Sequence, residues 1–84
     1  MSACAKQTFN SVTPDAWNCL VNKAASHGIT ISGPSGQATK DGFTVAWNYD
    51  STAQNLTLQC TDSPFWAPCS MINGKIHDLV EGCL

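Results

Sequence analysis

Arginine is absent from this chain of 84 residues, and its four lysines are spread singly along the sequence, at Lys6, Lys23, Lys40 and Lys75. The formal net charge is −2. A nucleic-acid-binding surface needs clustered basic side chains, with arginine as the preferred bidentate phosphate donor. The sequence therefore predicts no nucleic-acid partner.

Long apolar runs are also missing. A membrane-spanning helix needs about 18 or more consecutive apolar residues, and no such run occurs, so we expect no membrane span. The first six residues lack the apolar stretch of a signal peptide. Two compartments remain open: the cytoplasm, which is slightly favoured, and a secreted location for a mature chain.

No C-x-x-C pair occurs, and neither His27 nor His77 lies near a cysteine at the spacing of zinc ligands. The adjacent pair His77 and Asp78 would not face each other on a helix, which argues against a catalytic relay. No complete catalytic or nucleotide-binding motif is present. The sequence therefore predicts no metal and no cofactor, and it favours a non-enzymatic protein over an enzyme.

Charged residues are few, at 12%, about half of the usual share. The apolar share is 43%, with three tryptophans and three phenylalanines. This combination argues against disorder, because there is apolar surface to bury and little charge repulsion. We expect one α+β domain over residues 1–84, in which residues 1–11 are either flexible or contain a short edge strand at 6–9.

Two amphipathic helices frame the chain. Thr13 as N-cap, Pro14 at the first helical position and Gly28 after the last turn predict a helix over residues 14–27. His27 in its last turn suits the negative end of the helix dipole. A second helix is expected after the segment 64–68, because apolar residues recur there at helical spacing: Cys69, Ile72, Ile76, Leu79, Val80 and Cys83.

Between these helices the apolar period changes to two. Alternating side chains predict strands over residues 29–32, 37–40, 43–49 and 56–60, and Asp41-Gly42 is a hairpin turn signal. The short connections favour antiparallel pairing. The predicted fold is a three- to four-stranded antiparallel β-meander with one N-terminal and one C-terminal helix packed on a single face. The apolar face is expected to carry Ile29, Ile31, Phe43, Val45, Trp47, Tyr49, Leu56, Leu58 and Cys60.

The C-terminal half combines an Asn-Leu-Thr-Leu strand at 55–58, a Ser-Pro-Phe-Trp-Ala-Pro-Cys connection at 63–69 and a helix with Met-Ile-Asn-Gly-Lys-Ile at 71–76. It resembles a family of small uncharacterised bacterial proteins in which a strand, a Pro-Phe connection and a helix follow one another. In element order it is also similar to small proteins associated with polyhydroxyalkanoate granules. The resemblance implies the sheet-then-helix order and no catalytic residues.

Five cysteines leave two interpretations open: small buried hydrophobes, or partners in at least one disulfide. Cys69 stands at the start of the second helix, where the dipole can lower a thiol pKa, so it is the one candidate for a catalytic nucleophile. It is also a core residue candidate, or the disulfide partner of Cys60 across a short connection.

Phe65 and Trp66 lie in a proline-bracketed connection, where they either close the core or form a binding contact. The leading hypothesis is a small binding or accessory domain that engages a protein partner or an apolar ligand through this connection and the sheet surface. With few charges to block edge pairing, a homodimer is one form it could take. The alternatives are a thiol-dependent enzyme or redox protein using Cys69, and a secreted disulfide-stabilised structural or effector domain.

Overall fold

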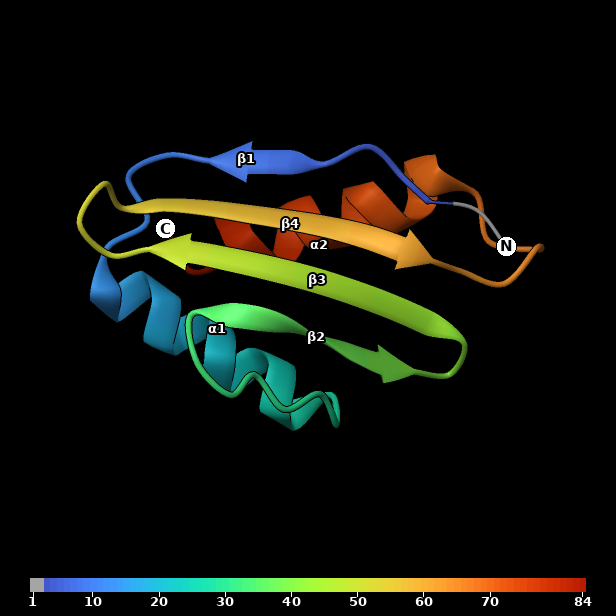
Figure 1. The fold of residues 1–84 in the computed structure, drawn as a ribbon, viewed down its shortest axis with the longest axis horizontal. Coiled ribbons are helices and arrows are strands. Elements are labelled where there is room, and N and C mark those ends of the chain that lie inside the picture. Colours follow the sequence, from blue (N-terminus) through green and yellow to red (C-terminus); the bar gives the residue numbers. More distant parts are fainter. Residues whose placement is uncertain (1–2) are drawn as a thin grey trace.

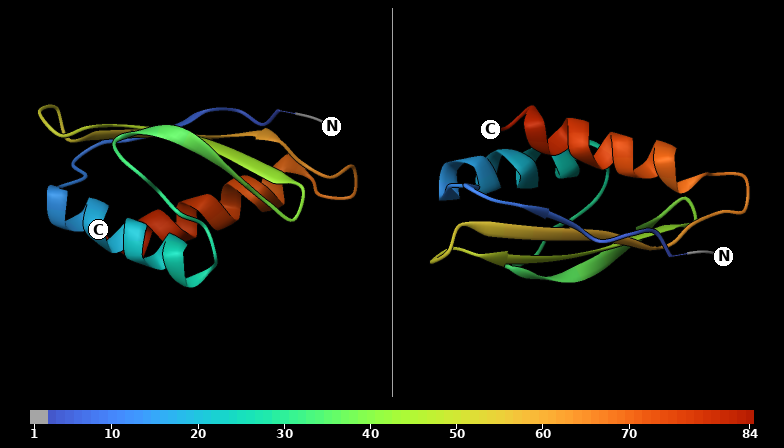
Figure 2. Two further views of the ribbon diagram at one scale, coloured as in Figure 1. Left: turned by 60° about the horizontal axis from the view of Figure 1, so that its bottom comes forward. Right: turned by 90° about the horizontal axis from the view of Figure 1, so that it is seen from above.

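The fold is a four-stranded antiparallel sheet with both helices on one face (Figure 1). The computed structural model describes residues 3–84. The elements follow in the order β1 (Gln7–Phe9), α1 (Pro14–Ser26), β2 (Ser35–Lys40), β3 (Phe43–Asp50), β4 (Asn55–Asp62) and α2 (Cys69–Glu81). Figure 2 shows the two layers, with both helices side by side on the same face of the sheet. The predicted α+β class and helix placement are confirmed.

Helix α1 begins and ends where the local signals place it. The Thr13 hydroxyl accepts a hydrogen bond from the Ala16 amide at 3.2 Å, and Pro14 takes the first helical position. The helix ends at Ser26, one residue before the predicted end, and Gly28 follows with a φ of +82°. A left-handed residue at this point is a common way to end a helix, and glycine adopts it without steric cost.

Strands β3 and β4 form the centre of the sheet, which has the order β1-β4-β3-β2. Their register sets Trp47 opposite Leu58 and Tyr49 opposite Leu56. Because directly opposed residues share a face, the alternating apolar side chains of both strands point to the helices. The β2–β3 hairpin closes through Asp41 and Gly42, both with positive φ, which is the geometry that the Asp-Gly signal predicts.

The predicted edge strand exists: β1 pairs with β4, setting Phe9 opposite Leu56. The alternative expectation was that residues 1–11 are flexible. Residues 1 and 2 of this segment lie outside the described part of the chain. The edge position of β1 leaves the β2–β3–β4 meander intact and extends the sheet beyond β4.

The predicted strand over residues 29–32 is wrong. The amide of Ile29 donates to the Ala24 carbonyl at 2.8 Å, which ties this segment to the end of α1. Strand β2 instead begins at Ser35, two residues before the predicted start. Gly36 is suited to this part of β2, because a Cβ there would lie 3.1 Å from the Trp47 ring, which is tighter than an ordinary contact. The missing side chain lets the large indole lie against β2.

Two disulfides tie the helices to the rest of the chain. Cys19 of α1 is bonded to Cys83 just after α2, and Cys4 before β1 is bonded to Cys69 at the start of α2. They close loops of 65 and 64 residues, for which the chain-entropy model gives about 4 kcal/mol of stabilisation each.

The predicted Cys60–Cys69 pair is therefore wrong. The amide of Cys4 donates to the Cys60 carbonyl at 2.8 Å, so the N-terminal segment runs beside the end of β4. This places Cys4 against the first turn of α2, where it bonds to Cys69. Cys60 is left as a free, fully buried thiol.

The buried core has two parts. The larger surrounds the α1 end of the sheet and contains Phe9, Val12, Ala16, Leu20, Trp47, Tyr49, Leu56 and Val80. The smaller lies beneath the start of α2 and contains Cys4, Cys60, Ala67 and Ile72. Ile76 packs against both parts. Between them, the side chains of Val45 and Leu58 in the two central strands are only partly buried.

Candidate ligand-binding cavity

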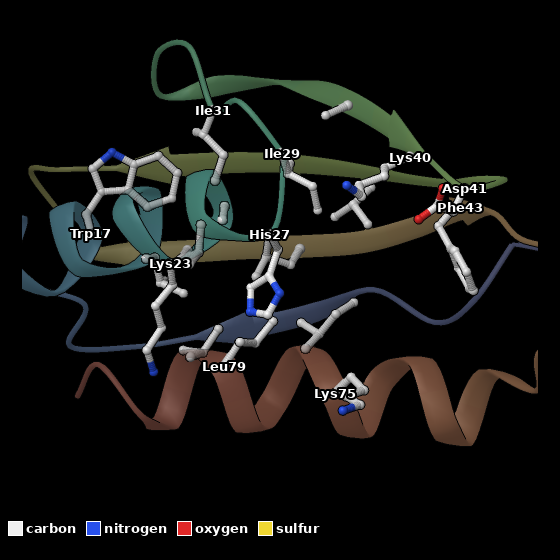
Figure 3. A pocket seen from close by; sticks show the side chains of 18 residues that line it. Trp17, Lys23, His27, Ile29, Ile31, Lys40, Asp41, Phe43, Lys75 and Leu79 are labelled. Carbon is white, nitrogen blue, oxygen red and sulfur yellow. The ribbon is translucent and has the colours of Figure 1, made fainter.

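A cavity of about 430 Å³ separates the sheet from the two helices (Figure 3). Its floor includes Val45, Leu56 and Leu58 from the central strands, and its walls come from α1, α2 and the connection that follows α1. Side chains at the middle of a covered sheet face are normally fully buried. Here Val45 and Leu58 are only partly buried and border an opening that reaches solvent.

The small side chain of Ala38 on β2 leaves part of this space open. The register with β3 sets Gly36, Ala38 and Lys40 opposite Trp47, Val45 and Phe43, on the face towards the helices. The space over Gly36 is filled by the Trp47 indole, whereas Ala38 and Lys40 line the cavity. The edge of the sheet over α1 therefore leaves a hollow that a larger apolar residue at position 38 would occupy.

The wall at the α1 end is rigidly supported. The indole of Trp17 stacks on the Tyr49 ring, with ring centroids 4.8 Å apart and an interplanar angle of 12°. The Tyr49 hydroxyl donates a buried hydrogen bond of 2.7 Å to the Val12 carbonyl. Trp17 also lines the cavity, so the stack holds in place one of the largest side chains of the cavity wall.

Eighteen residues line the cavity, and the ionisable ones are mostly basic: Lys23, His27, Lys40 and Lys75, with Asp41 as the single acid. The Lys40 ammonium lies against Gly28 at the end of α1, and that of Lys23 lies against Gly82 at the end of α2. Both positions are favourable for cations, because backbone carbonyls gather at helix C-termini. Within residues 3–84, no carboxylate forms an ion pair with any of the three lysines.

The rim is positive on a protein that is negative overall. Three lysines and one aspartate give the rim a formal charge of +2, with histidine neutral. The rest of the chain holds one lysine and five acidic residues, which give −4 and add up to the net charge of −2. This separation of charge is invisible in the sequence, where the lysines stand far apart.

Phe65 and Trp66, the predicted binding residues, lie on the surface, with 93% and 61% of their area exposed. They do not close the core. The Trp66 ring meets Phe43 edge-on, at 5.9 Å between centroids, and Phe43 lines the cavity. The aromatic connection therefore borders one end of the cavity. Its role in binding stays a prediction.

The structure leaves no reactive thiolate. The sulfur of Cys69, the candidate nucleophile, is bonded to Cys4 in a disulfide. Burial raises the pKa of the remaining Cys60 thiol, and the nearby Asp62 carboxylate acts in the same direction. The Cys60 thiol donates to the Asp62 carbonyl at 3.1 Å. A buried thiol with a raised pKa is the opposite of an activated nucleophile.

A second hollow lies between β1 and the last turns of α2, lined mainly by polar side chains. His77 there is 3.4 Å from Glu81 and 3.9 Å from Asp78, and all three side chains are exposed. Such solvent-exposed pairs contribute little to stability. His27 caps the C-terminal end of α1, where the sequence places it, and it also lines the first cavity.

Across residues 3–84, no group of three or more histidine, cysteine or acidic side chains could hold a metal ion. In the same part of the chain, neither helix has the length and apolar character to cross a membrane.

Sequence reasoning missed the basic rim. The available signal was Lys40, which follows Gly36 and Ala38 at a period of two and so occupies an inward position of β2. A lysine on the inward face of a strand indicates either an opening or an anionic partner. Comparisons with protein-family models, curated proteins and solved structures find no match for this chain, so the resemblance to small bacterial α+β proteins stays a prediction.

Proposed function

We propose that this protein is a non-enzymatic binding domain that holds an apolar small molecule in the cavity between its sheet and its helices. The carrying observation is the cavity of about 430 Å³, floored by partly buried Val45 and Leu58. Ligand sites of known proteins are mostly apolar hollows of roughly 300–1,000 Å³. Each 100 Å² of apolar ligand surface buried there contributes about 2.5 kcal/mol before the costs of association.

The walls of the cavity are held in place without a ligand. The Cys19–Cys83 bond joins α1 to the end of α2, and both helices line the cavity. A site formed in advance loses less conformational entropy on binding. This supports a mechanism in which the ligand enters a cavity that already exists, rather than one in which the helices fold around the ligand.

The proposal is tested by titrating the purified protein with the neutral dye N-phenylnaphthylamine and following dye fluorescence. We expect saturable binding that Ala38→Phe weakens at least tenfold, because the added ring occupies the cavity. Gln37→Phe adds the same ring to the outer face of β2 and should leave binding unchanged. Equal affinity for both variants, or no saturable binding to the unaltered protein, contradicts the proposal.

An oxidising compartment suits this protein better than the cytoplasm. Two disulfides in a small domain are typical of secreted and extracytoplasmic proteins, since cytoplasmic thiols are kept reduced. This supports the secreted, disulfide-stabilised alternative as the setting for the binding function. Intact mass before and after reduction should differ by the four hydrogens of two disulfides; equal masses would contradict it.

A contact with a protein partner at Phe65 and Trp66 is a second candidate function. It is favoured by the exposure of Phe65, at 93%. Large exposed aromatics are often anchors of protein interfaces. The dye titration separates the two functions, because changes at Phe65 should leave the cavity intact.

A further inference from the structure

The polar end of the ligand can be inferred from where the polar groups of the cavity lie. Thirteen of the eighteen lining residues are apolar, and the remaining five are the rim residues Lys23, His27, Lys40, Asp41 and Lys75. Apart from the indole N–H of Trp17, the apolar part offers no side-chain hydrogen-bonding group. A polar ligand atom placed there would lose its hydration without compensation. The cavity therefore suits a molecule whose only polar group stays at the mouth.

We propose that the ligand is a single-chain amphiphile with a carboxylate head, of the fatty-acid type. Its alkyl chain lies over Val45 and Leu58, and its carboxylate lies at the mouth, between Lys40 on the sheet side and Lys75 on α2. This inference rests on the proposed function and specifies the ligand of the same cavity.

The geometry supplies cations from separate elements. Lys40 projects from the end of β2, Lys75 from α2, and His27 stands at the end of α1 (Figure 3). A head group between these elements can be approached from more than one direction. Neither lysine is committed to a carboxylate of residues 3–84, so neither has to break an ion pair to meet a ligand.

Charge complementarity selects an anion over a neutral or cationic head. The rim carries +2 while the rest of the chain carries −4. An anion is therefore attracted to the mouth and repelled elsewhere, which also orients its approach. A cationic head would be repelled by the lysines around the cavity. The single acid, Asp41, does not balance them.

The test uses three ligands with the same alkyl chain: laurate, lauryl alcohol and lauryltrimethylammonium, each below its micellar concentration. We expect calorimetric titration to give the order laurate, alcohol, ammonium, with laurate at least tenfold tighter than the alcohol. Exposed charges are screened by salt. Raising the salt concentration should therefore weaken laurate binding and leave alcohol binding unchanged or stronger.

Variants identify the residues. Lys40→Gln with Lys75→Gln should weaken laurate binding by roughly two- to tenfold, the loss expected for two exposed charge interactions. Alcohol binding to the same variant should not change. Lys6→Gln removes an equal charge away from the cavity and is the matched control.

The outcomes separate the two proposals. Laurate and lauryl alcohol binding equally, or an equal loss of laurate affinity in Lys6→Gln and in the double variant, would overturn the carboxylate inference and leave the apolar cavity standing. Failure of all three ligands and of the neutral dye would overturn the proposed function itself.

Discussion

Trp17 and Tyr49 form one stacked pair, with their ring centroids 4.8 Å apart, although they lie on different layers of the fold. Trp17 belongs to α1 and Tyr49 to the end of β3. The Tyr49 hydroxyl is anchored at the Val12 carbonyl, just before α1 begins. The pair thus couples the position of α1 to the sheet at one end of the cavity.

Tyr49→Phe should reduce stability by about 1–2 kcal/mol, because the buried Val12 carbonyl loses its hydrogen-bond donor. The stack with Trp17 remains, so the dye affinity should change little. Urea denaturation measures the first effect and dye titration the second. A variant as stable as the original protein would contradict the structural role of this hydrogen bond.

Removing the Cys19–Cys83 bond with two serines should cost roughly 2–5 kcal/mol and should also weaken dye binding, since both helices line the cavity. The matched control replaces Cys4 and Cys69 with serine. That variant should lose comparable stability but keep its affinity, because the Cys4–Cys69 bond ties α2 to the N-terminal segment, which does not line the cavity. Equal dye affinity in the two variants would argue against the Cys19–Cys83 bond holding the helices around the cavity in place.

Cys60 makes stability depend on pH in the alkaline range. Because burial raises its pKa in the folded state, the folded protein retains a proton that the unfolded chain loses. Its contribution is complete below the ordinary thiol pKa of 9.0 and is lost as the pH rises from there through the folded pKa. Cys60→Ala should therefore lose less stability than the original protein between neutral pH and pH values above 9.0.

The same burial should make Cys60 react slowly with iodoacetamide in the folded protein and rapidly in urea. Labelling followed by intact mass measures both rates and counts the free thiols. Rapid labelling of Cys60 under native conditions would contradict its burial.

Phe65→Ser should change stability by no more than about 0.5 kcal/mol, since the ring is 93% exposed. Dye affinity should also stay the same, because Phe65 does not line the cavity. Phe43→Ser is the contrasting variant: its ring lines the cavity and meets Trp66, so both stability and dye affinity should fall. A large loss in Phe65→Ser would show that the ring is packed.

Local signals were enough for the elements that depend on neighbouring residues. Thr13, Pro14 and Gly28 set the limits of α1 to within one residue, and Asp41-Gly42 located the hairpin. The strand predictions failed where contacts with residues outside the segment determine the backbone conformation. Residues 29–32 alternate like a strand, yet Ile29 bonds to Ala24 at the end of α1. Strand β2 starts earlier, at Ser35, where it pairs with Asn48 of β3, and Gly36 leaves room for the ring of Trp47.

The sequence by itself determined the α+β class, the two amphipathic helices and the apolar face of β3 and β4, because periodicity and capping act over a few residues. Only the tertiary structure decided the cysteine pairing and the cavity. Cys4 and Cys69 are 65 residues apart, and they meet because the N-terminal segment runs beside β4. The rim likewise unites lysines from α1, β2 and α2, whose proximity follows from how the layers pack.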